Sequence, residues 1–349
     1  MSPPHPISKS IINWYSVNQR GLPWRENFLP YPVWLCEIMM QQTRIDTGIR
    51  YWNAFMERWP TVFDLAKAKE DEVMKAWQGL GYYNRARNLL AAAQTVVDHH
   101  GGQFPQTAQA LQQLPGVGPY TSAAISSICF GEPVAAVDGN VIRVLSRLFD
   151  VNQPVDKPKG RQTINDLAMM LMPKDRPGDH NQGMMELGAL VCKPRNPICH
   201  ACPVSSHCLA REREVQLKRP IKSGKTKIQE MALAFVVLTN GTHVALRQRP
   251  KSGIWGGLWT FLEQDQVPEG LGKKRGEVIP EFEHILTHRI MRLSFSLQLW
   301  NPSSPSEVAG KLGSAVAWLP WDEAEALALP RAVEKIWPDA VKSARKMYI

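Results

Sequence analysis

The fold is decided by the stretch Leu114–Asp138, LPGVGPYTSAAISSICFGEPVAAVD. Gly116 and Gly118 punctuate a tight turn, which leads into a helix of small residues predicted over Tyr120–Ile128. Glycines let the backbone pass close to a partner with its N–H groups exposed, and the N-terminus of the helix attracts anions. The turn is therefore interpreted as a phosphate-binding site. It matches neither G-x-x-x-x-G-K-[ST] nor G-x-G-x-x-G, and an ordinary turn before a helix remains the alternative.

Length and charge limit the classes of protein to which the chain can belong. It has 349 residues, 44% of them hydrophobic, and a formal net charge of +9. This length predicts about two domains, each with its own core. The positive charge predicts a polyanionic partner, such as nucleic acid or an acidic surface. No stretch reaches the roughly 18 apolar residues of a membrane span, and the N-terminus lacks an apolar signal core, so a cytoplasmic protein is expected.

The six cysteines are unevenly distributed along the chain. Cys36 and Cys129 stand alone in apolar segments and are interpreted as small buried residues. The other four have the spacing C-x6-C-x2-C-x5-C and are Cys192, Cys199, Cys202 and Cys208. In a chain without a secretion signal, such a cluster indicates a metal site rather than disulfides. Four thiolates in one continuous loop suit an iron–sulfur cluster, but the spacing alone leaves zinc open, with His200 and His207 as substitute ligands.

A helical pattern begins near Pro32 and continues to Ile45, with apolar residues at helical spacing. Glu37 lies in it between apolar neighbours at positions 36 and 38–40. An apolar pocket would raise the pKa of this carboxyl toward neutrality and make it a general acid. A solvated glutamate on a helix surface is the alternative. The amides of Gln41 and Gln42 could read base edges or wedge a duplex, or could simply lie on the helix surface.

Two further segments carry candidate functional residues. The segment Gly79–Arg87, GLGYYNRAR, places two tyrosines after two glycines and beside two arginines. Exposed aromatic and basic side chains suit stacking on bases and pairing with phosphates, although tyrosines are also common in cores. Asp138 begins the sequence DGNVIRVLSR and is expected to be the N-cap of a helix. A catalytic use of Asp138 would require it to face Glu37 across a cleft.

The remaining pattern divides the chain into a helical part and an α+β part. The first 210 residues are expected to be all-helical, with later helices over Arg161–Met172 and Gln182–Val191. Residues 214–230, rich in lysine and arginine, are predicted to form a linker. Strands are predicted over Ala232–Leu238, His243–Gln248, Arg289–Trp300 and Ala315–Leu319, and helices over Trp321–Leu327 and Arg331–Lys346.

Six motifs in order carry a family resemblance. They are LPWR at Leu22–Arg25, CEIMMQQTR at Cys36–Arg44, GLGYYNRARNL at Gly79–Leu89, LPGVGPYT, VDGNVIRVLSR and the cysteine loop. Together they resemble the MutY-type adenine DNA glycosylases over nearly the whole chain. The resemblance implies an all-α helix-hairpin-helix glycosylase domain with a [4Fe-4S] cluster loop over residues 1–213. Within it, a six-helix hairpin module covers about 23–127, and a cluster module covers 1–22 and 128–213. The basic linker 214–230 and an α+β Nudix-like domain for 8-oxoguanine recognition over 231–349 would follow.

The resemblance also implies an activity. It is the excision of adenine mispaired with 8-oxoguanine or guanine in double-stranded DNA, by a monofunctional, monomeric, nucleoid-associated glycosylase of base-excision repair. Adenine leaves a deoxyribose readily only if its ring is protonated and the positive sugar is stabilised, and the nucleotide must first be flipped out of the duplex. By resemblance, Glu37 protonates adenine N7 and later activates water, and Asp138 stabilises the oxocarbenium ion. Tyr120 and Asn140 orient these carboxylates.

The same resemblance implies further contacts with ligands. The four clustered cysteines would hold the [4Fe-4S] cluster, and an alkali cation would bind at the hairpin turn. Contacts with DNA are implied for Arg25, Gln42, Tyr82, Arg85, Gly116, Gly118 and His288. The family's Phe-Ser-His triplet is Leu286-Thr287-His288 here, which weakens the expected discrimination of 8-oxoguanine. The absence of the G-x5-E-x7-R-E-x2-E-E Nudix box predicts no nucleotide pyrophosphatase activity.

Two alternative functions differ from this one in a testable way. Endonuclease III-like enzymes carry a lysine where this chain has Tyr120, and use it as a Schiff-base nucleophile in an AP-lyase reaction. No lysine occurs between Lys75 and Lys157, so lyase activity is expected to be weak or absent. A non-catalytic iron–sulfur DNA-binding protein is the alternative from another class, against which the combination of Glu37, Asp138 and Tyr120 argues.

Overall fold

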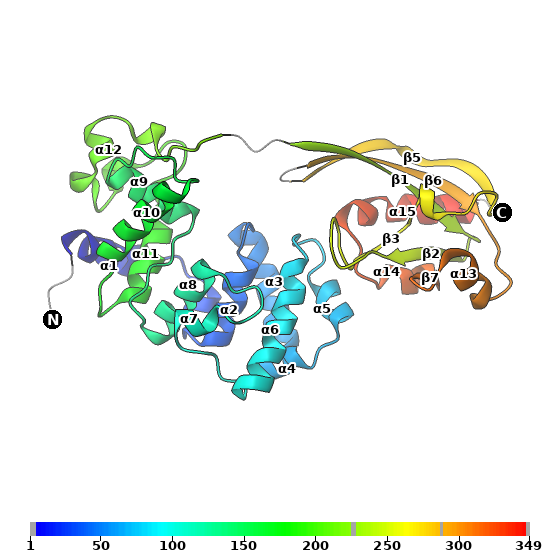
Figure 1. Cartoon of the computed structure of the whole chain (residues 1–349), viewed down its shortest axis with the longest axis horizontal. Coiled ribbons are helices and arrows are strands. Elements are labelled where there is room, and N and C mark those ends of the chain that lie inside the picture. Colours follow the sequence, from blue (N-terminus) through cyan, green and yellow to red (C-terminus); the bar gives the residue numbers. More distant parts are fainter. Residues whose placement is uncertain (1–4, 225–227, 287–288, 347–349) are drawn as a thin grey trace. The chain divides into compact units, whose positions relative to one another are not determined.

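The computed structural model describes residues 5–224, 228–286 and 289–346. The chain forms two compact units, and each of them takes in two segments of the sequence. The first unit comprises residues 1–67 and 88–225, and the second comprises residues 68–87 and 226–349. Figure 1 labels most of the helices and strands of both units. The segment 68–87 therefore packs with the C-terminal part of the chain, although helices of the first unit flank it in the sequence.

The first unit is built from helices. They are α1 (Pro6–Asn18), α2 (Pro30–Met39), α3 (Ile45–Arg58), α4 (Val62–Ala66), α7 (Ala108–Leu111), α8 (Pro119–Phe130), α9 (Gly139–Leu148), α10 (Pro158–Met170), α11 (Pro177–Leu190) and α12 (Leu209–Glu212). The segment 68–87 contributes α5 (Glu70–Ala76) and the start of α6 (Asn84–His100), which continues into the first unit. Among the described residues the first strand begins at Gln229, which confirms the prediction of a helical N-terminal part.

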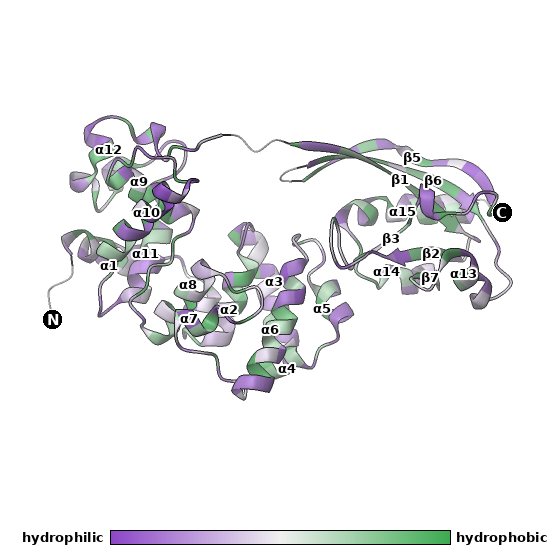
Figure 2. Cartoon of the chain, viewed as in Figure 1, coloured by the Kyte–Doolittle hydropathy of each residue, from purple (hydrophilic) through white to green (hydrophobic). Residues whose placement is uncertain are grey.

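Proline starts many of these helices, because its fixed φ suits the first helical position and its missing N–H would have no partner there. Hydrophobic and hydrophilic residues alternate along the longer helices, as Figure 2 shows. In the core formed by α1, α9, α10 and α11, the side chains of Ile11, Leu145 and Leu187 are fully buried. Each stabilises the unit by about 1.5–3 kcal/mol relative to an exposed position. No helix in the described ranges is long and apolar enough to cross a membrane.

The predicted continuous helix from Pro32 to Ile45 is wrong. Helix α2 ends at Met39 and α3 begins at Ile45. Between them Gln42 has a φ of 57°, a left-handed conformation that no helix can contain. The periodicity did not reveal the break, because residues 41–43 are polar and would also fit the exposed face of a continuous helix.

The second unit contains a mixed seven-stranded sheet. Its strands are β1 (Gln229–Thr239), β2 (His243–Gln248), β3 (Trp259–Thr260), β4 (Leu262–Glu263), β5 (Lys273–Leu286), β6 (Arg289–Leu299) and β7 (Val316–Pro320). The main path runs β3-β2-β1-β6-β5, while β4 pairs with β1 and β7 pairs with β2. Strands β1 and β6 are parallel, and the other pairs are antiparallel.

Helices supply the rest of the second unit's core. They are α13 (Pro305–Leu312), α14 (Trp321–Glu325) and α15 (Arg331–Lys346). Along β1, Phe235 and Val237 belong to the cluster that includes α15, whereas Val236 and Leu238 belong to the cluster that includes α13. The sheet is therefore buried on both faces, which explains why β1 reads as a continuous apolar run.

Most predicted elements of this unit are confirmed, including the hairpin between β1 and β2 and the helix over Arg331–Lys346. Strand β5 and helix α13 were not predicted. Strand β5 contains Gly276 and Pro280, residue types that are depleted in strands, and most of its side chains are exposed. Its pairing with β6 is irregular at several points. A strand with these features has no alternating apolar pattern to reveal it.

Candidate active site and cysteine loop

The glycine turn connects α7 to α8 and directs Tyr120 into a pocket. Gly116 has a φ of 74°, and a Cβ there would lie 2.7 Å from Asn88 Cβ, so both the backbone and the space require glycine. A Cβ at Gly118 would meet no protein atom within 4 Å, so this side of the turn is open. Helix α8 begins at Pro119, and Tyr120 in its first turn lines the pocket.

The pocket lies within the first unit and brings together the predicted catalytic residues. Glu37 comes from α2, Tyr120 from α8, and Asp138 and Asn140 from the start of α9. Further lining residues are Arg20, Leu22, Trp24, Arg25, Phe28, Val33, Cys36, Met40, Thr43, Ile45, Ile128, Gln182, Met185, Glu186 and Ala189. Glu37 and Asp138 thus line one cavity, which is the condition that a catalytic use of Asp138 requires.

Glu37 is partly exposed to the pocket, yet its surroundings shift the pKa of its carboxyl group. Burial is the largest cause, and the pKa of Glu37 is raised from 4.5 to about 7. The hydrogen bond with Tyr120 and the charge of Arg25 lower the pKa, while the negative charge of Asp138 raises it. A carboxyl with a pKa near neutrality can both donate and accept a proton at physiological pH.

Asp138 is the N-cap of α9, as predicted. Its Oδ1 accepts a hydrogen bond from the Val141 N–H at 2.7 Å, and its Oδ2 accepts one from the Asn140 side-chain amide at 2.7 Å. Burial raises the pKa of Asp138, while these hydrogen bonds and the charge of Arg143 lower it. The capping geometry therefore fixes the carboxylate at the pocket and supports its charged form.

Two arginines on α9 extend this arrangement toward the cysteine loop. The Arg143 guanidinium donates to Asn140 Oδ1 at 2.8 Å and to the carbonyl of Cys192 at 2.8 Å. One turn later, Arg147 donates to the Cys192 sulfur at 3.3 Å and to the carbonyl of Lys193 at 2.7 Å. Helix α9 thus carries an active-site residue at its start and holds the first cysteine of the loop with side chains further along.

A buried ion-pair cluster forms another part of the pocket wall. Glu186 on α11 is 1% exposed and accepts hydrogen bonds from the Arg20 guanidinium at 2.8 and 2.7 Å, and from Arg25 at 3.2 and 3.0 Å. Burial alone would raise its pKa, but the hydrogen bonds and charges of the two arginines lower it to about 2. Glu186 is therefore ionised throughout the physiological range.

Sequence reasoning missed Arg20, Gln182 and Glu186 as lining residues. Glu186 offered the same signal as Glu37, a lone carboxylate among apolar residues of a helix, here MMEL. Arg20 gave no such signal, because its partner Glu186 is 166 residues away in the sequence. The predicted DNA contact Arg25 turns its guanidinium toward Glu186, so a contact with phosphate would have to compete with this pair.

The two predicted wedge residues share an uncommon backbone conformation. Gln42, in the first unit, has a φ of 57°, and Tyr82, in the second, has a φ of 49° and is 44% exposed. Positive φ in residues other than glycine stores strain and is concentrated at functional sites. Arg85 is buried, and its guanidinium donates to the carbonyls of Leu80 and Gly81, so it supports the turn that carries Tyr82. His288 and Thr287 lie outside the described residues.

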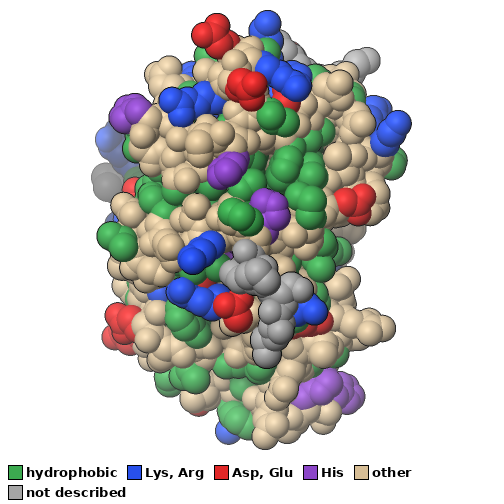
Figure 3. All heavy atoms as spheres, turned by 90° about the vertical axis from the view of Figure 1, so that its left-hand side faces the viewer, with side chains coloured by type: hydrophobic (Ala, Val, Ile, Leu, Met, Phe, Trp, Pro, Cys, Tyr) green, Lys and Arg blue, Asp and Glu red, His purple; other side chains and the backbone are tan. Residues whose placement is uncertain are grey.

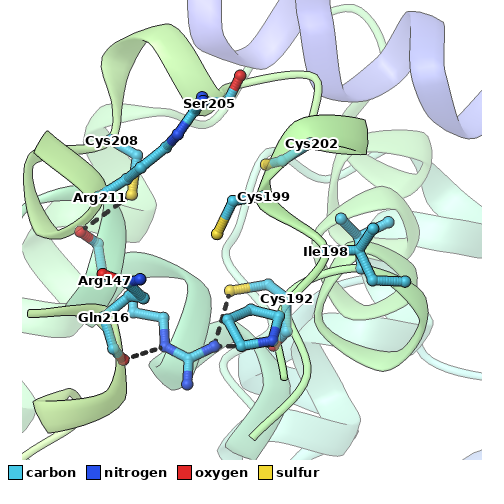
Figure 4. Close-up of a pocket in the computed structure, with 11 residues that line it drawn as sticks. Arg147, Cys192, Ile198, Cys199, Cys202, Ser205, Cys208, Arg211 and Gln216 are labelled. Atoms are coloured by element: carbon cyan, nitrogen blue, oxygen red, sulfur yellow. Dashed lines mark hydrogen bonds between the residues drawn. The ribbon is translucent and has the colours of Figure 1, made fainter. Parts of the chain in front are cut away.

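The cysteine loop closes around a small pocket. Cys192, Cys199, Cys202 and Cys208 all line it, together with Arg147 and Arg211. Figure 4 shows the four sulfur atoms directed toward a common space. In the described part of the chain, no group of three His, Cys, Asp or Glu side chains is arranged to hold a single metal ion. Four converging thiols with an arginine donating to one sulfur fit an iron–sulfur cluster, whose potential such hydrogen bonds tune.

Family models match three parts of the chain. The HhH-GPD superfamily of base excision DNA repair proteins matches residues 35–168, and the iron–sulfur binding domain of endonuclease III matches residues 192–208. The NUDIX domain matches residues 233–339. The iron–sulfur match begins and ends at the first and last of the four cysteines, so the cofactor of this loop is an iron–sulfur cluster of the [4Fe-4S] type. This assignment settles the choice that the spacing left open between zinc and iron.

Whole proteins of known identity are also similar. The adenine DNA glycosylase of Rattus norvegicus is 34% identical over 94% of this chain and 77% of its own length. That of Buchnera aphidicola subsp. Schizaphis graminum is 32% identical over 95% of this chain and 97% of its own length. The solved structure of a thermostable thymine-DNA glycosylase, 30% identical, covers 59% of this chain and 95% of its own with a TM-score of 0.54. A trapped endonuclease III–DNA covalent intermediate, 23% identical, covers 60% and 95% with a TM-score of 0.51 and has the same fold.

Proposed function

The chain belongs to the adenine DNA glycosylase family, and from this premise we propose that it excises adenine mispaired with 8-oxoguanine or guanine in duplex DNA. A member of this family is a DNA-binding N-glycosylase of base excision repair, a hydrolase. The observation that carries the proposal is the pairing of Glu37, whose pKa is about 7, with the fixed carboxylate of Asp138 in one pocket. N-glycosidic hydrolysis of adenine requires one proton donor and one anion, and this pocket supplies both.

The reaction proceeds through protonation of the flipped base. Glu37 donates its proton to adenine N7, the bond between N9 and C1′ breaks, and its electron pair stays with adenine. The positive charge that develops on the sugar is stabilised by Asp138, which Asn140 holds through a hydrogen bond of 2.7 Å. Water then attacks C1′ and gives its proton to the Glu37 carboxylate. Tyr120 orients Glu37 through their hydrogen bond.

The other wall of the pocket suits recognition of the base. Gln182 is 5% exposed and lies on the pocket wall beside the Glu186 cluster, where an amide can pair with the polar edge of adenine. Because two arginines keep Glu186 ionised, this wall keeps its charge when Glu37 changes protonation state. Base recognition is thus assigned to the Gln182 amide beside Glu186, and proton donation to Glu37.

The mode of DNA binding follows from the open turn and the strained residues. The N–H groups of Gly116 and Gly118 bind phosphate, with an alkali cation at the hairpin, while Gln42 and Tyr82 fill the opened duplex. The C-terminal unit reads the base opposite adenine, with His288 as a contact. Basic side chains support binding over a broad surface: on the face seen in Figure 3 they lie in several separate groups with hydrophobic side chains between them. The enzyme acts as a monomer.

The four cysteines Cys192, Cys199, Cys202 and Cys208 are the proposed ligands of the [4Fe-4S] cluster. When bound, the cluster cross-links the loop and so holds it on α9. The protein's own contribution is made by Arg143 and Arg147, whose hydrogen bonds tie the backbone of Cys192 to α9. The same Arg143 guanidinium supports Asn140, the partner of Asp138.

A single-turnover assay on a duplex with adenine opposite 8-oxoguanine tests the proposed function. Half of the product is treated with hot alkali and half is not, and a duplex with adenine opposite thymine serves as the control. Strand cleavage after alkali alone is expected, because the described residues that line the pocket include no lysine to form a Schiff base. Cleavage without alkali would reveal a lyase, and absence of cleavage in both halves would leave a DNA-binding protein without this activity.

A further inference from the structure

The turn that carries Tyr82 is held in a conformation that needs support. Gly79, Gly81 and Tyr82 have φ values of 92°, 76° and 49°. A tyrosine in the left-handed region is strained, and such strain persists only where the surroundings fix the backbone. Within the turn, the Trp77 Nε1–H donates to the carbonyl of Gly81 at 3.0 Å. This bond shapes the turn but does not attach it to another part of the second unit.

Arg87 supplies such an attachment. It lies in the first turn of α6, and its guanidinium reaches the glycine-rich loop 251–257 of the NUDIX-like fold. Its Nη1 donates to the carbonyl of Gly256 at 2.6 Å, and its Nη2 donates to the carbonyl of Lys251 at 3.0 Å. The same Nη2 donates to the side-chain oxygen of Asn84, next to the turn. The planar guanidinium presents Nη1 and Nη2 to the two carbonyls as a rigid pair of donors, whereas an ammonium group has a single nitrogen.

The loop is shaped to receive this side chain. Gly257 has a φ of 75°, and a Cβ at Gly257 would lie 2.6 Å from Arg87 Nη1. The backbone therefore favours glycine at position 257, and the Arg87 guanidinium would have to shift to admit a Cβ there. Trp255, next to Gly256, has a φ of 54°, so the loop contains a strained residue as the Tyr82 turn does.

Contacts beside Arg87 strengthen the attachment of the segment 68–87. The Lys75 ammonium donates to the carbonyls of Glu325 and Leu327 at 2.6 and 3.0 Å. The Leu329 N–H donates to the Gln78 side chain at 3.2 Å. These bonds agree with the assignment of this segment to the same compact unit as residues 226–349.

We propose that Arg87 is a positioning residue that fixes the Tyr82 turn to the glycine-rich loop 251–257. The wedge that enters the duplex and the fold that reads the opposite base then form one body, and the inference rests on the proposed function in assigning these two roles. Loss of the Arg87 bonds lets the turn move independently of the loop. Discrimination between 8-oxoguanine and guanine is lost in consequence, while the pocket around Glu37 is unaffected.

A direct contact between Arg87 and a phosphate is the competing explanation. Arginine and lysine both attract phosphate, but the single nitrogen of a lysine at position 87 cannot occupy the positions of both Nη1 and Nη2. The variant Arg87→Lys therefore keeps the positive charge and loses the paired Nη1 and Nη2 donors, whereas Arg87→Met loses both the charge and the donors. Lys251→Met is the matched control, because it removes a positive charge beside the same contact and keeps the backbone carbonyl. The ion pair it breaks, with Glu70 at 3.0 Å, is exposed and contributes little.

The experiment has two readouts on the full-length protein. Hydrogen–deuterium exchange of the DNA-free protein follows residues 79–85 and 251–257. Equilibrium affinity is measured for two duplexes that carry 2′-fluoro-2′-deoxyadenosine opposite either 8-oxoguanine or guanine. This adenosine analogue resists excision. Both Arg87 variants are expected to exchange faster in the two segments and to lose about fivefold or more of the wild-type preference for 8-oxoguanine. Lys251→Met is expected to match the wild type in both readouts.

Four results would overturn the inference. Exchange that is unchanged in both Arg87 variants would show that no attachment exists. Recovery of wild-type behaviour in Arg87→Lys, or an equal defect in Lys251→Met, would show that charge alone matters. Faster exchange with an unaltered preference would show that the attachment has no role in recognition. A wild-type protein with no preference for 8-oxoguanine would instead refute the opposite-base part of the proposed function, and the exchange data would still decide whether Arg87 fixes the turn.

Discussion

Glu37 and Glu186 line the same pocket, but their environments drive their protonation in opposite directions. Glu37 is buried near the Asp138 carboxylate and hydrogen-bonds Tyr120, while the nearby Arg25 donates its hydrogen bonds to Glu186; the pKa of Glu37 is about 7. Glu186 is also buried, but it accepts hydrogen bonds from two arginines, and its pKa is about 2. Burial by itself therefore does not determine the role of a carboxylate. The presence or absence of a cationic partner separates a proton donor from a permanent anion.

Removal of the proton donor should have the largest effect. Glu37→Gln keeps the size and polarity of the side chain but cannot transfer a proton to adenine. Excision of adenine opposite 8-oxoguanine should fall by about 10³-fold or more, while affinity for the duplex stays within a few fold. Single-turnover kinetics and binding measured on the same preparation check this. A variant that still cleaves within tenfold of the wild-type rate would remove Glu37 from the chemistry.

Removal of the second negative charge should have a somewhat smaller effect. Asp138→Asn retains an oxygen that can cap α9 and accept from Val141, so the fold should lose no more than about 1 kcal/mol. The developing charge on the sugar loses its anion, and excision should fall by about 10²–10³-fold. Thermal unfolding measured in parallel separates the two effects. A rate loss that merely follows a loss of folded protein would contradict the catalytic role.

Removing the negative charge of Glu186 should affect the stability of the fold more than the rate of excision. Glu186→Gln leaves Arg20 and Arg25 with a neutral partner, and unfolding free energy should fall by about 3–5 kcal/mol. The pKa of Glu186 is lowered in the folded state, so its stabilisation should be present above pH 4.5 and lost as pH falls toward 2. Urea unfolding of wild type and variant between pH 3 and 7 measures this. The difference between the two proteins should shrink on acidification, and a difference independent of pH would contradict the ion-pair explanation.

Local sequence features predicted one side of this pocket and not the other. Gly116 and Asp138 were identifiable because a left-handed turn and an N-cap are set by neighbouring residues. The pairing of Glu186 with Arg20 joins residues 166 positions apart, and no local pattern encodes it. Arg85 was expected at the DNA surface, but its side chain is buried in the turn because the carbonyls of that turn need donors.

The division of the chain into units could also be predicted only in part from the sequence. The family motifs predicted a helical part and a NUDIX-like part, both of which are confirmed by the matches to residues 35–168 and 233–339. The attachment of residues 68–87 to the C-terminal unit was not predicted. It depends on hydrogen bonds from side chains such as Lys75 and Arg87 to backbone carbonyls far along the chain. Carbonyl acceptors are present at every residue, so the sequence gives no sign of which ones are used.

The dependence of the wild-type excision rate on pH tests the role of Glu37 most directly. Because the donor must be protonated, the single-turnover rate constant at saturating enzyme should fall as pH rises above about 7, approaching a tenfold loss per pH unit. On the acid side, protonation of Asp138 should lower the rate at a pH above the usual range of an aspartate, because burial raises its pKa. A bell-shaped profile with its alkaline limb near pH 7 is the predicted result. A rate constant that is unchanged, or that increases, between pH 7 and 9 would show that Glu37 is not the proton donor.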